Sequence, residues 1–290
     1  MDFTTFQTEL RRVAGTVQAF AAVGAALRLQ HAGRQADPAV QARLVAAVEA
    51  VMPGALDGLN PQQISDALAY VTQQIGEATD LFYNADRPPG WVLQDPDILQ
   101  GLGRSSRQNI RSIVELAANR PNLAASLAGC FLDVGTGVGG MALEAAELCP
   151  SLRVVGMDIW EPSLALARAN VAASSHAARI EIRAQDVTQL DEPAAYTLAW
   201  LPAPFLPRRV GEVALDRLAA ALAPNGHLVV GLLSVPTDKA GTALLALRTV
   251  RSGGHVWEVS EIEQELHARG FVDVETCIIP PTTFVIGRRP

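Results

Sequence analysis

The chain has 290 residues, of which 49% are hydrophobic and 18% charged, so it can bury a large core and does not have the composition of a disordered protein. Its 23 Lys and Arg residues stand against 30 Asp and Glu residues, and the net charge of −7 opposes binding to the phosphate backbone of a nucleic acid. The three cysteines have no C-x-x-C spacing, which argues against a disulfide framework or a zinc cluster and favours a reducing, cytoplasmic location.

An apolar run between Val13 and Leu27 follows two arginines, as in a signal peptide. Acidic residues precede the arginines, however, and polar residues interrupt the run. The run is also shorter than the ~20 residues that a membrane span requires. We therefore expect an amphipathic or buried helix here and no membrane partner.

The pattern is helical up to about residue 125. Asp37-Pro38, Asn60-Pro61 and Asp95-Pro96 each place a capping side chain before a proline that suits the first helical turn. A helix is predicted to begin at each of them. Prolines and a glycine just before Trp91 predict a loop that interrupts the helices. We expect residues 1–125 to form an all-helical domain that covers a substrate site as a lid or mediates dimerisation.

After residue 129 short apolar runs alternate with segments compatible with helices, which is typical of a parallel sheet covered on both faces. The link between the last two runs is too short for a parallel crossover, so the last strand should be antiparallel. The predicted strands are residues 130–134, 152–157, 180–183, 196–200, 227–233, 271–279 and 283–287. The predicted fold class is α/β, with a doubly wound, seven-stranded and mostly parallel sheet in a domain of residues 126–290.

The strongest motif is D-V-G-T-G-V-G-G at residues 133–140, where a predicted strand runs directly into a glycine-rich turn and a helix. Glycine is needed in such a turn because a side chain would keep the backbone away from a ligand at the helix N-terminus. The spacing fits both the dinucleotide motif G-x-G-x-x-G and the pattern D-x-G-x-G. Asp158 ends the next strand, where both kinds of site place an acid that accepts hydrogen bonds from ribose hydroxyls.

These residues resemble the class I S-adenosylmethionine-dependent methyltransferases, and the resemblance covers residues 130–290. Residues 132–139, 156–159 and 184–187 are similar to the first three motifs of the family, and residues 222–228 to the turn before its fifth strand. Asn225 replaces one glycine of that turn, a change that a turn tolerates. The antiparallel C-terminal hairpin is also typical of this family and not of nicotinamide dehydrogenases.

The resemblance implies S-adenosyl-L-methionine as the cofactor. It places Asp133 and the glycine backbone at the methionyl end of the cofactor, Asp158 at the ribose and Asp186 at the adenine amino group. The residues expected to bind the cofactor are Asp133, Gly135, Thr136, Gly137, Gly139, Asp158, Ile159, Trp160, Asp186, Val187, Leu201 and Ser106.

The fourth motif predicts the kind of acceptor. Enzymes of this family that methylate base amines carry Asp, Asn or Ser before a proline pair, whereas Leu201 stands here and cannot accept a hydrogen bond. Together with the net charge, this favours a small-molecule acceptor over nucleic acid. Residues 89–106 also resemble the segment before the first motif in bacterial natural-product methyltransferases. Candidate residues for the substrate pocket are Tyr83, Trp91, Phe205 and Trp257.

Methyl transfer from a sulfonium needs no catalytic triad and no metal, because the cofactor carries the activated group. The histidines show no metal-ligand spacing, so we expect no metal. His255 precedes a predicted helix near Ser260 and could face the substrate as a base, or it could be a solvated loop residue.

The predicted function is therefore methyl transfer from S-adenosylmethionine to a small molecule of secondary-metabolite type, by a protein that could be a homodimer. One alternative keeps the cofactor but cyclises it with release of methylthioadenosine, or uses its cation to assist a rearrangement. Another is a non-catalytic binding protein, since fold does not determine function.

Overall fold

The computed structural model describes all residues from 1 to 290 and separates into two compact units, residues 1–86 and 87–290. The domain boundary predicted near residue 125 therefore lies further along the chain than the observed boundary, which follows residue 86. The helices α4 (Pro96–Ala117) and α5 (Pro121–Ser126) belong to the second unit, in which α4 packs along α6 (Gly140–Leu148). Helical periodicity alone does not reveal which core a helix joins, so the sequence grouped α4 with the preceding helices.

The first unit is all-helical, as predicted, and consists of α1 (Phe3–His31), α2 (Pro38–Val51) and α3 (Pro61–Tyr83). The predicted caps are present, since the Asp37 side chain accepts from the Ala39 amide at 2.9 Å and Asn60 forms a capping box with Gln63. Its small core contains Val23, Leu27, Val48, Ile64 and Val71.

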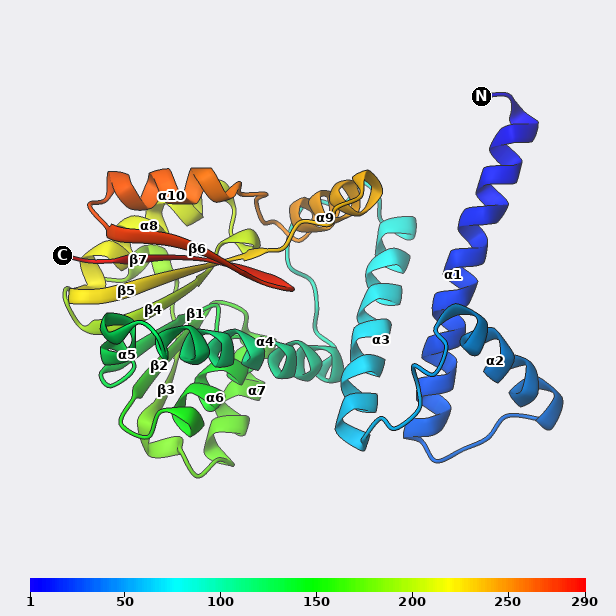
Figure 1. The fold of residues 1–290 in the computed structure, drawn as a ribbon, viewed down its shortest axis with the longest axis horizontal. Helices are drawn as coiled ribbons and strands as arrows, with labels where there is room; N and C mark the ends of the chain where they lie inside the picture. The colour runs from blue at the N-terminus through cyan, green and yellow to red at the C-terminus, as the bar shows by residue number, and fades with distance from the viewer. The chain divides into compact units, whose positions relative to one another are not determined.

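The second unit is built on a single seven-stranded sheet (Figure 1). Its strands are β1 (Cys130–Val134), β2 (Arg153–Asp158), β3 (Ile180–Ala184), β4 (Tyr196–Pro202), β5 (Leu222–Leu233), β6 (Val272–Ile279) and β7 (Thr282–Arg288). They lie in the order β3-β2-β1-β4-β5-β7-β6. Strands β1 to β5 are parallel and β7 is antiparallel to both of its neighbours, which confirms the predicted fold.

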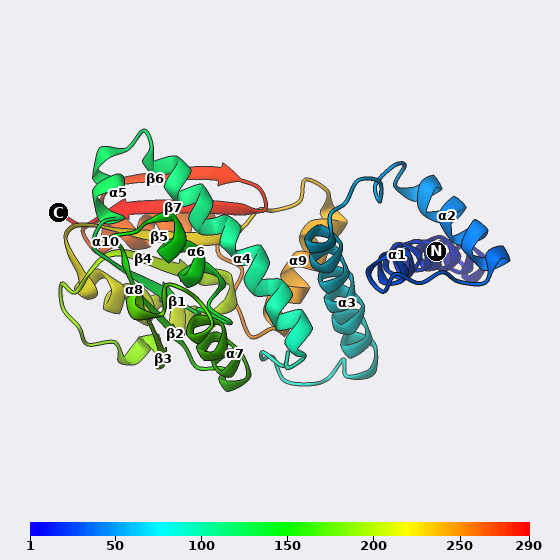
Figure 2. The ribbon, with the colours of Figure 1, turned by 90° about the horizontal axis from the view of Figure 1, so that it is seen from below.

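Helices cover both faces of the sheet. Figure 2 looks at the face on which α4 runs across α6, and α7 (Glu161–Ala172) lies beside them. The opposite face carries α8 (Arg208–Ala221) and α10 (Val259–Ala268), while α9 (Lys239–Arg251) follows β5. Alternate residues of β1 enter the two cores, with Phe131 on the α6 side and Leu132 on the α8 side. The central strands are buried on both faces and read as largely apolar runs, whereas the edge strands β3 and β6 carry charged residues and are partly exposed.

The turn predicted before the fifth strand is part of β5, which begins at Leu222 and not at His227. Leu222 pairs with Tyr196 and His227 with Leu198, so the residues between them loop out of the ladder. Asn225 adopts the left-handed conformation there (φ 65°), which explains why asparagine can replace glycine.

Candidate functional site

The glycine-rich turn lies at the carboxyl edge of the sheet, between the end of β1 and the start of α6. Gly135, Gly137 and Gly139 all have positive φ values, of 65°, 57° and 79°. Residues that carry a side chain rarely adopt this backbone conformation, so the turn requires glycine at these positions. The Thr136 amide donates to the Met157 carbonyl at 3.0 Å and ties the turn to β2. The N-cap residue of α6 is Gly139, which provides no side-chain cap, and in the first turn the Ala142 amide lies within reach of the Asp133 carboxylate.

Asp158 links this turn to the loop that follows β2. One carboxylate oxygen accepts from the Gly137 amide at 2.8 Å. The other accepts from the Ile159 and Trp160 amides at 2.7 and 2.9 Å. A carboxylate has about four acceptor positions, so at least one remains for a ligand. Its assignment to the ribose stays a prediction that this geometry permits.

Asp133 lies beneath the turn and is 1% exposed. Its carboxylate accepts from the Thr136 hydroxyl at 2.7 Å. Burial, and to a smaller degree the nearby charge of Asp158, raise the pKa of Asp133 to about 7. In this structure Asp133 supports the turn from below, and its expected contact with the methionyl group remains untested.

We expect Asp133→Asn to change the pH dependence of stability. Because the pKa of Asp133 is above its usual value in the folded state, its stabilising contribution is complete below about pH 4 and is lost as the pH rises to about 7. Asparagine has the same shape, still accepts from Thr136 and does not ionise. The unfolding free energy of the variant minus that of the natural protein should therefore rise by a few kcal/mol over this range and then level off. Denaturant titrations at several pH values, without ligand, measure this difference, and a difference independent of pH would contradict the assignment.

The structure places the other predicted cofactor residues after β2 and β3 or inside the core. Asp186 and Val187 follow β3 at the same edge, where Asp186 accepts from the amide and the hydroxyl of Thr188, each at 2.8 Å, and the Val187 side chain is buried. Ile159 is exposed after β2. Leu201 is completely buried in the core on the α8 side, so its side chain faces away from solvent and packing accounts for it.

Ser106 and Trp160 make contacts that the sequence did not predict. The Ser106 hydroxyl donates to the Gly103 carbonyl at 2.8 Å and lies against Gly140, at the start of α6. The Trp160 indole donates to the Leu93 carbonyl at 2.8 Å. Ser106 therefore packs α4 against the end of the glycine-rich turn. Trp160 joins the loop after β2 to the segment before α4.

The structure brings together two of the four predicted substrate residues. The rings of Trp91 and Phe205 meet edge to face, with centroids 6.0 Å apart. Tyr83 belongs to the first unit, where it is exposed and packs on Phe82. Trp257 is 6% exposed and packs against Gly211 of α8, and its indole N–H is buried without a hydrogen-bond partner. Its place in the substrate pocket stays a prediction.

His255 packs edge to face on Trp257, with ring centroids 4.9 Å apart. Its Nε2 atom lies 3.5 Å from a guanidinium nitrogen of Arg208, which is itself paired with Glu212 and Glu261. The imidazole is half-buried, and its loop touches Pro204 and Phe205, in the turn that follows β4, through Gly254. A role as base remains a prediction for His255.

Sequence reasoning missed the residues that hold α4 against the glycine-rich turn. A methyl group on Gly103 would lie 2.1 Å from the Val138 side chain, and one on Gly140 would lie 1.9 Å from the Gly103 carbonyl oxygen. Asn170 of α7 donates to the Val138 carbonyl at 2.9 Å and exchanges hydrogen bonds with Gln100. Gly101 and Gly103, in the helix predicted to begin at Asp95-Pro96, were the available signal, because glycine inside a helix often marks a close approach.

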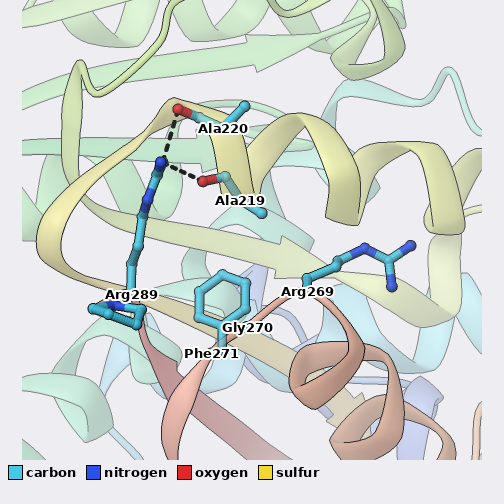
Figure 3. A pocket seen from close by; sticks show the side chains of 7 residues that line it. Ala219, Ala220, Arg269, Gly270, Phe271 and Arg289 are labelled. Atoms are coloured by element: carbon cyan, nitrogen blue, oxygen red, sulfur yellow. Dashed lines mark hydrogen bonds between the residues drawn. The ribbon is translucent and has the colours of Figure 1, made fainter.

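A hollow of about 480 Å³ lies elsewhere, beside the end of α8 (Figure 3). Arg289 crosses it and donates to the carbonyls of Ala219 and Ala220, the last groups of that helix. Because α8 ends where β5 begins, this hollow is at the amino edge of the parallel strands, opposite the glycine-rich turn. The Arg289 guanidinium caps the C-terminus of α8.

Comparison with known proteins identifies the domain. Residues 131–226 match the family described as methyltransferase domain. The chain is 33% identical over 116 residues to the ubiquinone/menaquinone biosynthesis C-methyltransferase of Geobacter sulfurreducens, covering 38% of this chain and 44% of that one. It is 34% identical over 121 residues to the demethylmenaquinone methyltransferase of Thermus thermophilus, covering 41% and 52%. The chain thus spans about half the length of these curated relatives.

A third relative is the tRNA1(Val) (adenine(37)-N6)-methyltransferase of Phocaeicola vulgatus, 27% identical over 179 residues, which cover 54% of this chain and 75% of that one. Two solved structures share the fold over nearly the whole chain. An O-methyltransferase family protein from Burkholderia thailandensis has a TM-score of 0.72 at 14% identity, with 97% of both chains covered. Human N-acetylserotonin methyltransferase, solved in complex with SAM, has a TM-score of 0.72 at 15% identity, with 100% of this chain and 98% of that one covered.

The sheet order, the antiparallel last strand and the glycine-rich turn define the fold of the class I S-adenosylmethionine-dependent methyltransferases. Residues 131–226 match the methyltransferase domain family, which confirms the resemblance seen in the motifs. None of the helices is long and apolar enough to cross a membrane.

Proposed function

We propose that this protein transfers the methyl group of S-adenosyl-L-methionine to a small organic acceptor of secondary-metabolite type. The observation that carries the proposal is the hydrogen bond between Asp158 and the Gly137 amide, which joins the two loops at the carboxyl edge of the sheet. Open α/β sheets bind ligands at this edge, where neighbouring loops diverge. The methyltransferase domain match over the same residues supports the cofactor.

The residues present fit S-adenosylmethionine. Gly139 provides no side-chain cap at the N-terminus of α6, and a helix N-terminus without such a cap suits a carboxylate such as that of the methionyl group. Gly135 is exposed, and a methyl group there would meet the Pro202 ring at 3.2 Å, so the missing side chain leaves room beside the turn. The free acceptor position of Asp158 suits ribose hydroxyls, and the exposed Ile159 offers an apolar surface for a base.

When bound, the cofactor supplies an activated methyl group on a sulfonium. The protein then has to orient the acceptor and exclude water. The segment that follows β4, residues 202–205, contains two prolines, an alanine and a phenylalanine and offers no side chain that could accept a proton. A proton released by the acceptor would therefore pass to another group, and His255 is the titratable residue whose loop touches this segment.

A small acceptor is favoured over nucleic acid for two reasons. The chain carries a net charge of −7, which repels phosphate groups. Leu201 and its neighbours also lack a polar side chain that could hold the amine of a base. Because one relative is a tRNA methyltransferase, the test must also include tRNA as an acceptor.

The test is incubation of the full chain with methyl-labelled cofactor, once alone, once with a panel of small phenols, amines and enols, and once with total tRNA. We expect S-adenosylhomocysteine to form only with a small acceptor. Transfer to tRNA would contradict the small-molecule assignment. Release of methylthioadenosine from the cofactor alone would show intramolecular chemistry, and cofactor binding without any product would favour a binding protein.

A further inference from the structure

We propose that residues 87–95 form a strap across the cofactor site and that Trp160 is the positioning residue that holds this strap closed. The proposal rests on the proposed function, because the strap is assigned to retention of the cofactor. The term strap denotes residues 87–95, which have no regular secondary structure and precede α4 in the second unit.

The strap is anchored at one end beside the loop that follows α9. The Gly90 amide donates to the Arg251 carbonyl at 3.0 Å, and the Arg87 guanidinium donates to the carbonyls of Pro88, Gly90 and Arg251. Gly253 lies so close that a methyl group on it would be 3.1 Å from the Gly90 Cα atom. The Gly90 backbone and the Arg87 side chain therefore hold this end together.

The next contacts place the strap over the ends of two strands. Trp91 meets Phe205, the last residue of the short 3-10 turn η3 (Ala203–Phe205) that follows β4. Leu93 accepts from the Trp160 indole, which follows β2. In the sheet, β1 lies between β4 and β2, and β1 is the strand that runs into the glycine-rich turn. The strap therefore passes the carboxyl end of β1, where the turn begins.

The dimensions agree with such a crossing. Neighbouring strands are about 4.8 Å apart, so the ends of β4 and β2 are separated by roughly 10 Å. Two residues of extended chain reach roughly 7 Å, and the side chains of Trp91 and Trp160 span the remainder. The strap is thus stretched across one strand width and is held at the far side by one hydrogen bond, to Trp160.

Because this hydrogen bond joins the strap to the loop after β2, we expect the strap to open where Leu93 contacts Trp160. Its partner is a backbone carbonyl, so only the indole N–H can be changed by substitution without altering the strap itself. Trp160→Phe keeps an aromatic ring beside Asp158 and removes the donor. Val92→Ala is the matched control, because Val92 lies in the strap between the two anchors and its side chain is exposed.

The experiment measures hydrogen–deuterium exchange of residues 87–95 by mass spectrometry in the full chain, together with the dissociation rate of S-adenosylmethionine. We expect cofactor to slow exchange in the natural protein. In Trp160→Phe, exchange of the strap without ligand should rise about fivefold, as expected for loss of one neutral hydrogen bond, and the cofactor should dissociate faster by a similar factor. Val92→Ala should change neither, and thermal melting verifies that each variant is folded.

Two results would overturn the proposal. Unchanged exchange in Trp160→Phe would show that Trp160 does not hold the strap. Faster exchange with an unchanged dissociation rate would show that the strap does not cover the cofactor. Failure of the natural protein to bind cofactor at all is a different outcome, which contradicts the proposed function and the retention role with it, while the exchange data still decide the anchoring.

Discussion

Replacing Asp158 by asparagine is expected to weaken binding of S-adenosylmethionine by about a hundredfold or more. A hydrogen bond to a charged acceptor contributes about 1.5–3 kcal/mol, and tenfold in affinity corresponds to about 1.4 kcal/mol. The variant loses the charge that would accept from the ribose. It also loses one of the two oxygens that hold the turn, because Gly137 binds one oxygen while Ile159 and Trp160 bind the other. An amide has only one oxygen, so one set of amides must face its NH₂ group.

Isothermal titration calorimetry measures the affinity, and circular dichroism checks the fold. Asp191→Asn is the matched control, because it removes the same charge from an exposed carboxylate that follows β3 and η2 (Val187–Gln189). Its affinity should stay within about twofold, since exposed charges contribute little across solvent. Equal affinities for Asp158→Asn and the natural protein would exclude Asp158 from the cofactor site.

Gly140→Ala is expected to destabilise the second unit by about 3 kcal/mol or more, at the upper end of the cost of overpacking. The new methyl group would lie 1.9 Å from the Gly103 carbonyl oxygen and 2.8 Å from the Ser106 hydroxyl. The first of these neighbours is helix backbone, which cannot rotate away, so α4 and α6 have to separate. Because α6 begins at the glycine-rich turn, we also expect cofactor affinity to fall.

Gly76→Ala provides the comparison, since Gly76 lies inside α3 and a methyl group there meets nothing within 4 Å. It should stabilise the first unit by about 0.5–1 kcal/mol through helix propensity alone. Denaturant unfolding measures both changes. A Gly140→Ala protein as stable as the natural one would show that the α4–α6 contact is not as close as this structure has it.

Local signals in the sequence predicted most of the second unit correctly. The helix beginning at Asp95-Pro96 is capped by the Asp95 side chain, and α7 and α8 lie in helix-compatible segments between the predicted strands. These features depend on residues a few positions apart, so the pattern determines them. The central parallel strands were visible because burial on both faces favours apolar residues, while the edge strand β3 was visible from its alternation of apolar and charged residues.

The sequence was less informative where the deciding contact is distant along the chain. Trp257 was predicted to line the substrate pocket, and the sequence could not reveal that α8 supplies Gly211 and Arg208 as its neighbours, from almost fifty residues away. Leu201 was grouped with the cofactor residues because of its motif, whereas its side chain points into the core on the α8 side. Which face of a buried strand receives a given side chain depends on register, and register is set by pairing with other strands.

What the sequence determined by itself was the turn at residues 133–140, because three left-handed backbone positions require glycine in any context, and the acid that ends β2. Only the tertiary structure decided that Asp158 binds the Gly137 amide, that Gly103 and Gly140 meet, and that Leu93 reaches Trp160. These contacts join residues that are 21 to 67 positions apart in the chain. They form because the parallel strands bring their carboxyl ends to one edge, where loops distant in sequence become neighbours.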